Sequence, residues 1–214
     1  MTKRFLLVAG NIGAGKTTLT DRLATRLGWD GAYENVENNP FLSDFYDDMR
    51  KWAFHLQVYF LGDRAAQHLK MSASPRSAII DRSIYEDAHI FARAAHHLGN
   101  ITEREYLAYR QLFDIVVGEL PTPDLLLFLD ASVETLMERI YGRGRDMEGG
   151  ITADYLGLLD SYYQDWLAGF DLCPVLTIPA DDLNFVNNEQ HIGIIIARIN
   201  EKLAGKEEVV FPEV

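Results

Sequence analysis

The chain has 214 residues, of which 48% are hydrophobic and 24% charged, and this is the composition of one globular domain with a sizeable core. Its formal net charge of -12 argues against general affinity for nucleic acid or anionic lipid, because an acidic surface repels polyanions. A single cysteine, Cys173, excludes an internal disulfide framework, and no apolar run is long enough to span a membrane, so we expect a cytoplasmic protein with no membrane or nucleic-acid partner.

Short apolar runs and longer helical segments alternate along the chain. The runs predict strands buried on both faces at 4–10, 77–81, 124–130 and 174–178, and a weaker strand near 32–34. Helical periodicity covers 16–27, 51–70, 88–97, 103–117, 133–143, 153–170 and 190–203. Alternating strands and helices indicate right-handed crossovers, so the predicted fold is α/β, a parallel five-stranded sheet with helices on both faces. We expect a single domain over 1–205 and a C-terminal tail over 206–214.

A phosphate-binding motif follows the first strand and opens the first helix. Residues 10–17, GNIGAGKT, fit G-x-x-x-x-G-K-S/T in the strand-to-helix context that a P-loop requires. Backbone N–H groups and the helix N-terminus would hold the phosphates, Lys16 would reach the outer ones, and Thr17 would hold magnesium. The predicted nucleotide-binding residues here are Gly10, Asn11, Ile12, Gly13, Ala14, Gly15, Lys16, Thr17 and Thr18. The sequence therefore predicts a P-loop NTPase-type fold that binds a nucleoside triphosphate.

Two classes of P-loop protein fit the sequence poorly. A GTPase switch needs a guanine-reading N-K-x-D, and no asparagine in this chain is followed by lysine. A motor or transport ATPase usually carries further modules, for which this length leaves no room. A small-molecule phosphotransferase remains, and such an enzyme needs arginines that cover the transferring phosphoryl group and exclude water.

The segment RIYGRGRD, residues 139–146, supplies these arginines. Arg139 and Arg143 are four residues apart and share one helical face, and Arg145 follows in a segment where glycines 149 and 150 allow a hinge. The alternative interpretation is a solvated helix end, where arginines are favoured by the helix dipole. Beside a P-loop, an arginine-rich lid over about 139–150 is the stronger hypothesis.

Five motifs in combination resemble the deoxyribonucleoside kinase family, in particular its bacterial deoxyadenosine/deoxyguanosine kinase branch. In order they are GNIGAGKT, YENVENNPFL, FYDDMRKWAFHLQVYFLGDR, DRSIYED and RIYGRGRDME, and together they span most of the chain. The resemblance implies an ATP-dependent kinase of nucleotide salvage that uses Mg²⁺, phosphorylates the 5'-hydroxyl of a deoxynucleoside and forms a homodimer. It favours a purine substrate, deoxyadenosine or deoxyguanosine, over deoxycytidine.

The resemblance also assigns roles on the acceptor side. Glu34 would be the general base for the 5'-hydroxyl, and Arg82 would bridge Glu34 and the 5'-oxygen. Asp81 would serve the magnesium, directly or through water, with Asp130 at the end of another apolar run as its rival. Animal members of the family carry a glutamate where this chain has Asp81, and the shorter side chain favours a water-mediated contact.

The nucleoside and the ATP base would be held by residues spread over the chain. Family resemblance gives Tyr46 and Glu148 to the 3'-hydroxyl, and Gln57, Arg64, Asp87 and Phe91 to the base. Gln57 has apolar neighbours and would be costly to bury without a partner, which favours a ligand-facing role. The loop with Asp182 and Leu183 would contact the adenine of ATP through its backbone. Glu86 receives no role.

Two other functions stay open. A thymidylate-kinase-like enzyme would share the P-loop, the Asp-Arg pair and the lid, but its phosphate acceptor would not need Glu34 as a base. The chain could also be a non-catalytic, nucleotide-binding subunit with a kinase-like fold. Such a subunit would not need the complete set of proposed chemical residues, which this chain retains.

Overall fold

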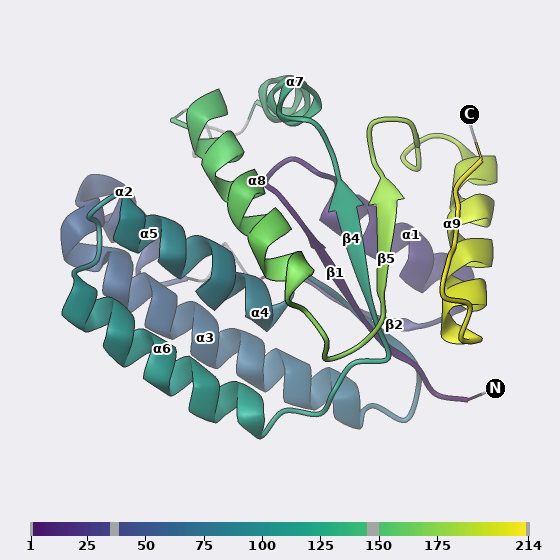
Figure 1. Ribbon diagram of the computed structural model, residues 1–214, viewed down its shortest axis with the longest axis horizontal. Coiled ribbons are helices and arrows are strands. Elements are labelled where there is room, and N and C mark those ends of the chain that lie inside the picture. The colour runs from purple at the N-terminus through teal and green to yellow at the C-terminus, as the bar shows by residue number, and fades with distance from the viewer. Residues whose placement is uncertain (1, 35–38, 145–149, 213–214) are drawn as a thin grey trace.

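The structure, a computed structural model, describes residues 2–34, 39–144 and 150–212 and contains one five-stranded parallel sheet (Figure 1). The strand order is β2-β3-β1-β4-β5. The strands are β1 (Phe5–Gly10), β2 (Asp30–Ala32), β3 (Ala78–Asp81), β4 (Leu125–Asp130) and β5 (Val175–Pro179). The predicted α/β class and five-stranded parallel sheet are confirmed, and β1, which leads into the P-loop, lies at the centre.

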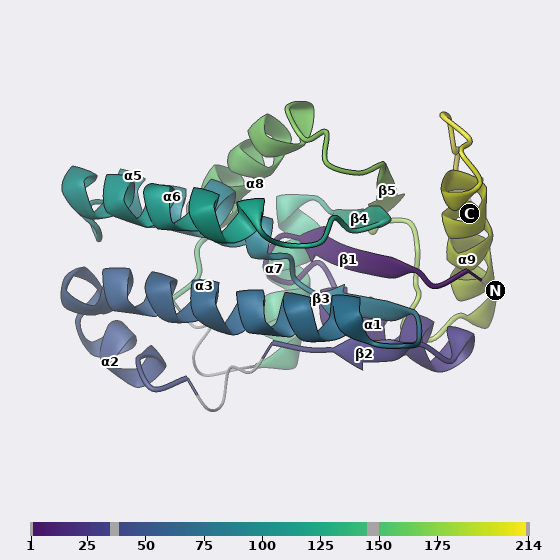
Figure 2. The same cartoon turned by 90° about the horizontal axis from the view of Figure 1, so that it is seen from below.

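Helices cover both faces of the sheet (Figures 1 and 2). One face carries α3 (Met49–Ala73), α4 (Ile84–Glu86), the π-helical segment η1 (Asp87–Ala92), α5 (Arg93–His97), α6 (Glu103–Gly118) and α8 (Ala153–Ala168). The other face carries α1 (Lys16–Leu27), α7 (Val133–Arg143) and α9 (Glu189–Leu203). A short helix, α2 (Leu42–Asp47), packs on α3. This arrangement leaves the carboxyl edge of the strands for the P-loop and the turn after β3.

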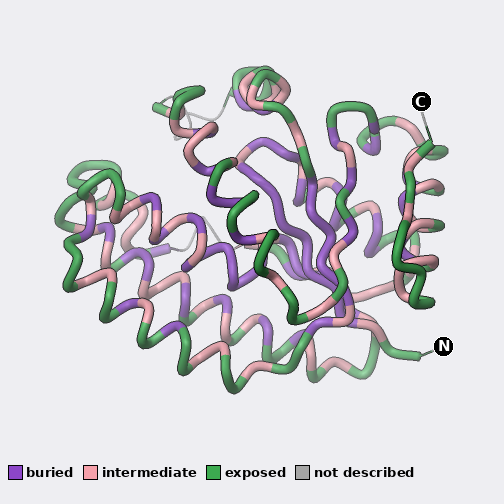
Figure 3. Tube along the Cα trace, viewed as in Figure 1, coloured by how far each residue is buried: buried purple, intermediate pink, exposed green. Residues whose placement is uncertain are grey.

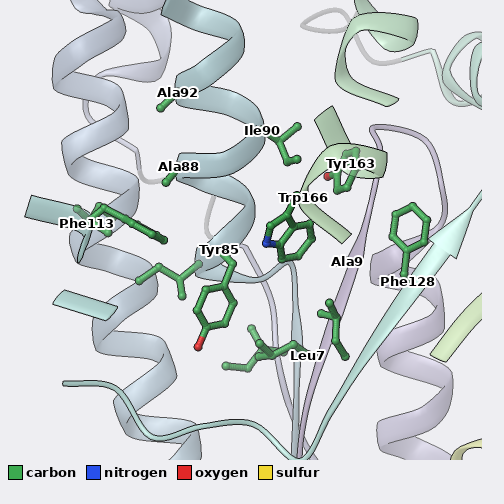
Figure 4. Close-up of a cluster of buried hydrophobic side chains, with 14 of the residues drawn as sticks. Leu7, Ala9, Tyr85, Ala88, Ile90, Ala92, Phe113, Phe128, Tyr163 and Trp166 are labelled. Atoms are coloured by element: carbon green, nitrogen blue, oxygen red, sulfur yellow. The ribbon is translucent and has the colours of Figure 1, made fainter. Parts of the chain in front are cut away.

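The central strand shows why its sequence is almost continuously apolar. Every residue of β1 is buried (Figure 3). Leu7 and Ala9 point into the cluster that includes Trp166 and Tyr163 of α8 (Figure 4), whereas Leu6 and Val8 point to the opposite cluster beneath α1 and α9. A strand covered on both sides cannot alternate apolar and polar residues.

The structure corrects two predicted boundaries and adds one helix that was not predicted. The edge strand β2 ends at Ala32, so Glu34 lies in the following loop rather than at a strand end. The helical region predicted from residue 88 begins at Ile84, because Ser83 and Glu86 form a capping box that starts a helix immediately after β3. Helix α2 was not predicted, and it has no buried residue that would produce an apolar period.

Cys173 packs, half-buried, against the core. Burial raises the pKa of its thiol to about 12, so it is not a reactive thiolate at neutral pH. Within the described ranges, no helix combines the length and the apolar character needed to cross a bilayer.

Candidate active site

Glycines allow the P-loop to lie close against neighbouring elements. Gly13 and Gly15 have φ values of +88° and +99°, a region that favours glycine. A Cβ atom at Gly15 would lie 3.0 Å from Cζ of Phe185, and one at Gly13 would lie 3.0 Å from the carbonyl oxygen of Leu136. Phe185, from the loop after β5, therefore packs directly on the P-loop, a contact that no sequence pattern indicated.

Lys16 is buried at the start of α1, and its ammonium group is oriented by the loop itself. Nζ donates to the carbonyl oxygens of Gly10 at 2.7 Å and Asn11 at 2.9 Å. An ammonium group has three N–H donors, so one remains for an outer phosphate. Burial, helped by the nearby charge of Arg82, lowers the pKa of Lys16 to about 8. A bound phosphate would favour its charged form again.

Thr17 and Asp81 meet at the edge of the sheet, as the magnesium hypothesis requires. Oγ1 of Thr17 donates to Oδ2 of Asp81 at 2.6 Å, because β3 lies next to β1 and ends beside the P-loop. Asp130, the rival, is exposed at the end of β4 and lines a different cavity with Asp181. The geometry therefore favours Asp81.

A continuous set of ion pairs joins the predicted catalytic base to the predicted base-reading residues. Arg64 of α3 places Nη2 2.6 Å from Oε1 of Glu34 and Nε 2.8 Å from Oδ1 of Asp87. Nε of Arg82 lies 3.3 Å from Oε2 of Glu34. One cluster of charged side chains is thus formed by segments that are far apart in sequence. They are the loop after β2, helix α3 and the segment after β3.

These charges fix the ionisation of Glu34. Burial by itself would raise the pKa of Glu34, but the guanidinium groups of Arg82 and Arg64 lower it to about 2. Glu34 is therefore a carboxylate throughout the physiological pH range and able to accept a proton. Burial raises the pKa of Asp87 to about 7, against the opposing effect of Arg64 and Arg82.

Arg82 has a backbone conformation that marks a constrained turn. It is the one described residue other than glycine with positive φ, at 71°, a conformation that costs about 1 to 3 kcal/mol. Its guanidinium carbon lies 4.4 Å from the ring centroid of Phe91, a cation–π contact that orients both side chains. Stacking of Phe91 on a nucleobase stays a prediction.

Gln57 has the environment expected of a ligand-binding amide. Its side chain is 7% exposed, and its Oε1 has no hydrogen-bond partner among the described residues. A buried acceptor without a donor is costly, which supports the predicted contact with a ligand. Gln57 and Arg64 are both buried on α3, and Phe60 between them contacts Arg64 at 5.3 Å. Tyr46, the predicted sugar contact, lies on α2 and is 46% exposed.

The lid arginines are described in part. Arg139 on α7 donates to the carbonyl oxygens of Ala14 at 3.1 Å and Ala180 at 2.6 Å, so it ties the P-loop to the end of β5. Arg143 is exposed at the end of α7. Arg145 and the predicted 3'-hydroxyl contact Glu148 lie outside the described residues. The approach of these arginines to a phosphoryl group stays a prediction.

The loop after β5 carries the two residues predicted to contact the ATP base. Leu183 is buried and Asp182 is exposed, so side chains from this loop face both the core and the solvent. Contact of Asp182 and Leu183 with adenine stays a prediction.

Glu86, which received no role in the sequence analysis, is fully buried beside the P-loop. Its Oε1 accepts from the backbone N–H of Gly10 at 3.2 Å and its Oε2 from that of Ser83 at 2.6 Å. The spacing Ser83-x-x-Glu86 is a capping-box pattern that indicates the second contact. The first contact joins segments 76 residues apart and has no local signal.

Comparison with known proteins gives a consistent result. The family model described as deoxynucleoside kinase matches residues 6–204. A deoxyadenosine/deoxycytidine kinase of Bacillus subtilis (strain 168) is 38% identical over 91% of this chain and 90% of its own. A deoxyguanosine kinase of Lactobacillus johnsonii is 37% identical over 92% of each chain.

A solved structure of the deoxyadenosine kinase from M. mycoides, with the products dCMP and a flexible dCDP bound, is also similar. Its TM-score is 0.78 at 28% identity, covering 92% of this chain and 99% of that one. The predicted family and enzyme class are thus confirmed. The P-loop, the Asp-Arg turn and the Glu34–Arg64–Asp87 cluster lie within a chain that belongs to the deoxynucleoside kinase family.

Proposed function

We propose that this kinase transfers the γ-phosphoryl group of ATP to the 5'-hydroxyl of a purine deoxynucleoside, with deoxycytidine as a further substrate. The observation that carries the proposal is the ionised Glu34, held by Arg64 and Arg82 at the same sheet edge as the P-loop. A hydroxyl acceptor must lose its proton during transfer, and a positioned carboxylate can take it. A thymidylate-type acceptor is already ionised and needs no such base.

The donor side would act through positioning and charge. The P-loop backbone and Lys16 bind the phosphates, and Arg82 stabilises the charge that develops near the 5'-oxygen. We propose that residues 139–150 form a lid in which Arg143 and Arg145 approach the phosphoryl group. Arg139, which bonds to the P-loop at Ala14, would link movement of the lid to the phosphate site.

Magnesium would be held by Thr17 and Asp81. A hydroxyl and a carboxylate that already lie 2.6 Å apart are the hard oxygen ligands that Mg²⁺ takes beside substrate phosphates. When bound, the ion would neutralise phosphate charge. Among the described residues there is no group of three or more His, Cys, Asp or Glu that could hold a metal ion.

Base selection would use Gln57, Arg64, Asp87 and Phe91. The unpartnered Oε1 of Gln57 favours a base that offers it a donor, such as the exocyclic amine of adenine. Arg64 is bonded to both Asp87 and Glu34, so the same guanidinium would contact the base and orient the catalytic carboxylate. The names of the relatives, which cover deoxyadenosine, deoxyguanosine and deoxycytidine, support a preference for bases that carry an amino group.

Tyr46 and Glu148 would hold the 3'-hydroxyl, and Asp182 and Leu183 would lie against the adenine of ATP. A homodimer is supported by apolar side chains exposed on α6, of which Leu107 is 57% and Ile115 is 64% exposed. These two residues are eight apart and therefore share one face of the helix. We also propose that the enzyme acts in the cytoplasm, in nucleotide salvage.

The test is a phosphorylation assay with ATP and Mg²⁺ across the four deoxynucleosides, adenosine and thymidine monophosphate. The expected result is formation of 5'-monophosphates from deoxyadenosine or deoxyguanosine, with deoxycytidine slower and thymidine slowest. Activity on thymidine monophosphate alone would show a monophosphate kinase, and binding of ATP without transfer to any acceptor would show a non-catalytic subunit.

A further inference from the structure

Tyr163 of α8 lies in a buried apolar cluster (Figure 4), and its hydroxyl pairs with Glu86 of α4, which is also fully buried. The hydroxyl of Tyr163 lies 2.6 Å from Oε1 of Glu86 and 2.8 Å from the carbonyl oxygen of Gly10. Its single proton is shared between these two acceptors. Both side chains are fully buried, so each polar atom needs its partner within the protein.

The pair holds the peptide groups of Gly10 on both sides. The N–H of Gly10 donates to Oε1 of Glu86, and its carbonyl oxygen faces both Tyr163 and Nζ of Lys16. Since that carbonyl is one of the two groups that orient Lys16, a shift of the Gly10 backbone moves the ammonium group. The negative charge of Glu86 also favours the charged form of Lys16.

Glu86 also holds the acceptor side of the site. Its second oxygen accepts the N–H of Ser83, the residue directly after Arg82 and its strained backbone. The backbone N–H groups of Gly10 and Ser83 both donate to Glu86, and the Tyr163 hydroxyl lies within hydrogen-bond distance of it as well. One carboxylate thus joins the loop that binds the phosphoryl donor to the turn that carries Asp81 and Arg82.

We propose that Glu86, with Tyr163, is a positioning residue that fixes the separation between Lys16 on the donor side and Arg82 on the acceptor side. In this proposal neither residue contacts the reacting atoms, since both are fully buried and bonded within the protein. They act on the position of the P-loop, which binds the phosphoryl donor, relative to the turn with Asp81 and Arg82, which serves the acceptor. Phosphoryl transfer depends on this relative position because the attacking oxygen and the phosphorus must be in line with the leaving oxygen. The proposal rests on the phosphotransfer put forward above.

The expected signature is a loss of turnover without a matching loss of binding. Tyr163→Phe removes one hydroxyl and should lower kcat about tenfold. Glu86→Gln places an N–H opposite one of the donors that now bond to the carboxylate, and it should lower kcat up to about a hundredfold, the loss expected when reacting groups are misplaced by about 1 Å. Dissociation constants for ATP and for the deoxynucleoside, measured separately by calorimetry, should change less than threefold. A general loss of structure would weaken both bindings instead.

A double-variant cycle separates this role from two independent defects. Because both residues act on the Gly10 peptide, Glu86→Gln with Tyr163→Phe should have nearly the kcat of Glu86→Gln alone. Tyr162→Phe is the matched control, since Tyr162 is the adjacent tyrosine on α8 and packs against Arg93 at 4.0 Å instead of the P-loop. It should retain wild-type kcat.

Two outcomes would overturn the inference. One is kcat within twofold of wild type in Tyr163→Phe, a variant mild enough to fold even if Glu86→Gln does not. The other is a parallel rise of both dissociation constants. A wild-type enzyme that binds ATP but phosphorylates no deoxynucleoside would refute the proposed function instead, so the two failures are distinguishable.

Discussion

Replacing Arg64 with methionine would break the buried ion pair with Asp87 and the partly buried one with Glu34. Methionine has a similar length and no charge, so it leaves both carboxylates in place without their shared guanidinium. Asp87 is 2% exposed and loses the contacts with Nε of Arg64 at 2.7 and 2.8 Å. Its remaining cation, Arg82, also serves Glu34.

The expected loss of stability is large. Removing one partner of a buried ion pair costs about 3 to 5 kcal/mol, and for a domain of this size each kcal/mol lowers Tm by roughly 2 to 4 °C. Arg64→Met should therefore unfold roughly 6 to 20 °C below the wild type. Arg64→Met with Asp87→Ala removes both charges and should recover most of that loss.

The loss should also depend on pH. The pKa of Asp87 is raised in the folded state from 3.8 to about 7, so its contribution to stability is complete below about pH 4 and is lost as the pH rises through 7. Without Arg64 the pKa rises further, and the loss continues above pH 7. The stability gap between Arg64→Met and the wild type should therefore widen from pH 6 to pH 8, and the double variant should show no such widening.

Thermal unfolding followed by circular dichroism at pH 6, 7 and 8 measures these differences. Lys70→Met, an exposed substitution on the same helix, is the control and should stay within about 0.5 kcal/mol of the wild type. A single variant as stable as the wild type, or a double variant less stable than the single, would refute the account of this cluster. The double variant should also relax specificity towards thymidine, and an unchanged substrate ranking would show that the base is read elsewhere.

Further predictions concern the catalytic base, its ionisation, the P-loop and assembly. Glu34→Gln should cut kcat by at least about a hundredfold while ATP affinity stays within twofold, and near-normal turnover would remove Glu34 from the mechanism. Because the pKa of Glu34 is lowered to about 2, its contribution to stability is present above about pH 4.5 and lost as the pH falls through 2. For the same reason Glu34 stays ionised between pH 4 and 6, and the pH profile of kcat/KM should show no titration of Glu34 in that range. A fall in kcat/KM in that range that disappears in Glu34→Gln would contradict this. In urea unfolding, Gly15→Ala should destabilise the fold by about 1 to 3 kcal/mol, because φ is +99° and the new methyl group would meet Phe185. The control is Gly157→Ala on α8, which has open space around it and should be neutral or slightly stabilising. Ile115→Glu should convert a dimer to a monomer in sedimentation experiments, and an unchanged mass would place the interface elsewhere.

Much of the fold could be predicted from local sequence patterns. The P-loop and the helix that follows it are specified by glycines, a lysine and a threonine at fixed spacing, and each central strand by a short apolar run. These signals are local, since backbone conformation and periodic burial depend on near neighbours. The short edge strand β2 and helix α2 lack such signals and were misplaced or missed.

The site divides in the same way. The sequence by itself predicted the phosphate loop, and its resemblance to the deoxyribonucleoside kinase family predicted residues for metal, acceptor and base, including Glu34, Arg64 and Asp87. Only the tertiary structure decided that Arg64 bonds both carboxylates, and that Glu86 holds the Gly10 backbone together with Tyr163. Such contacts join segments between 23 and 153 residues apart, and they form because parallel strands bring their carboxyl ends to one edge. A lone glutamate or tyrosine carries no local sign of the partner that burial will give it.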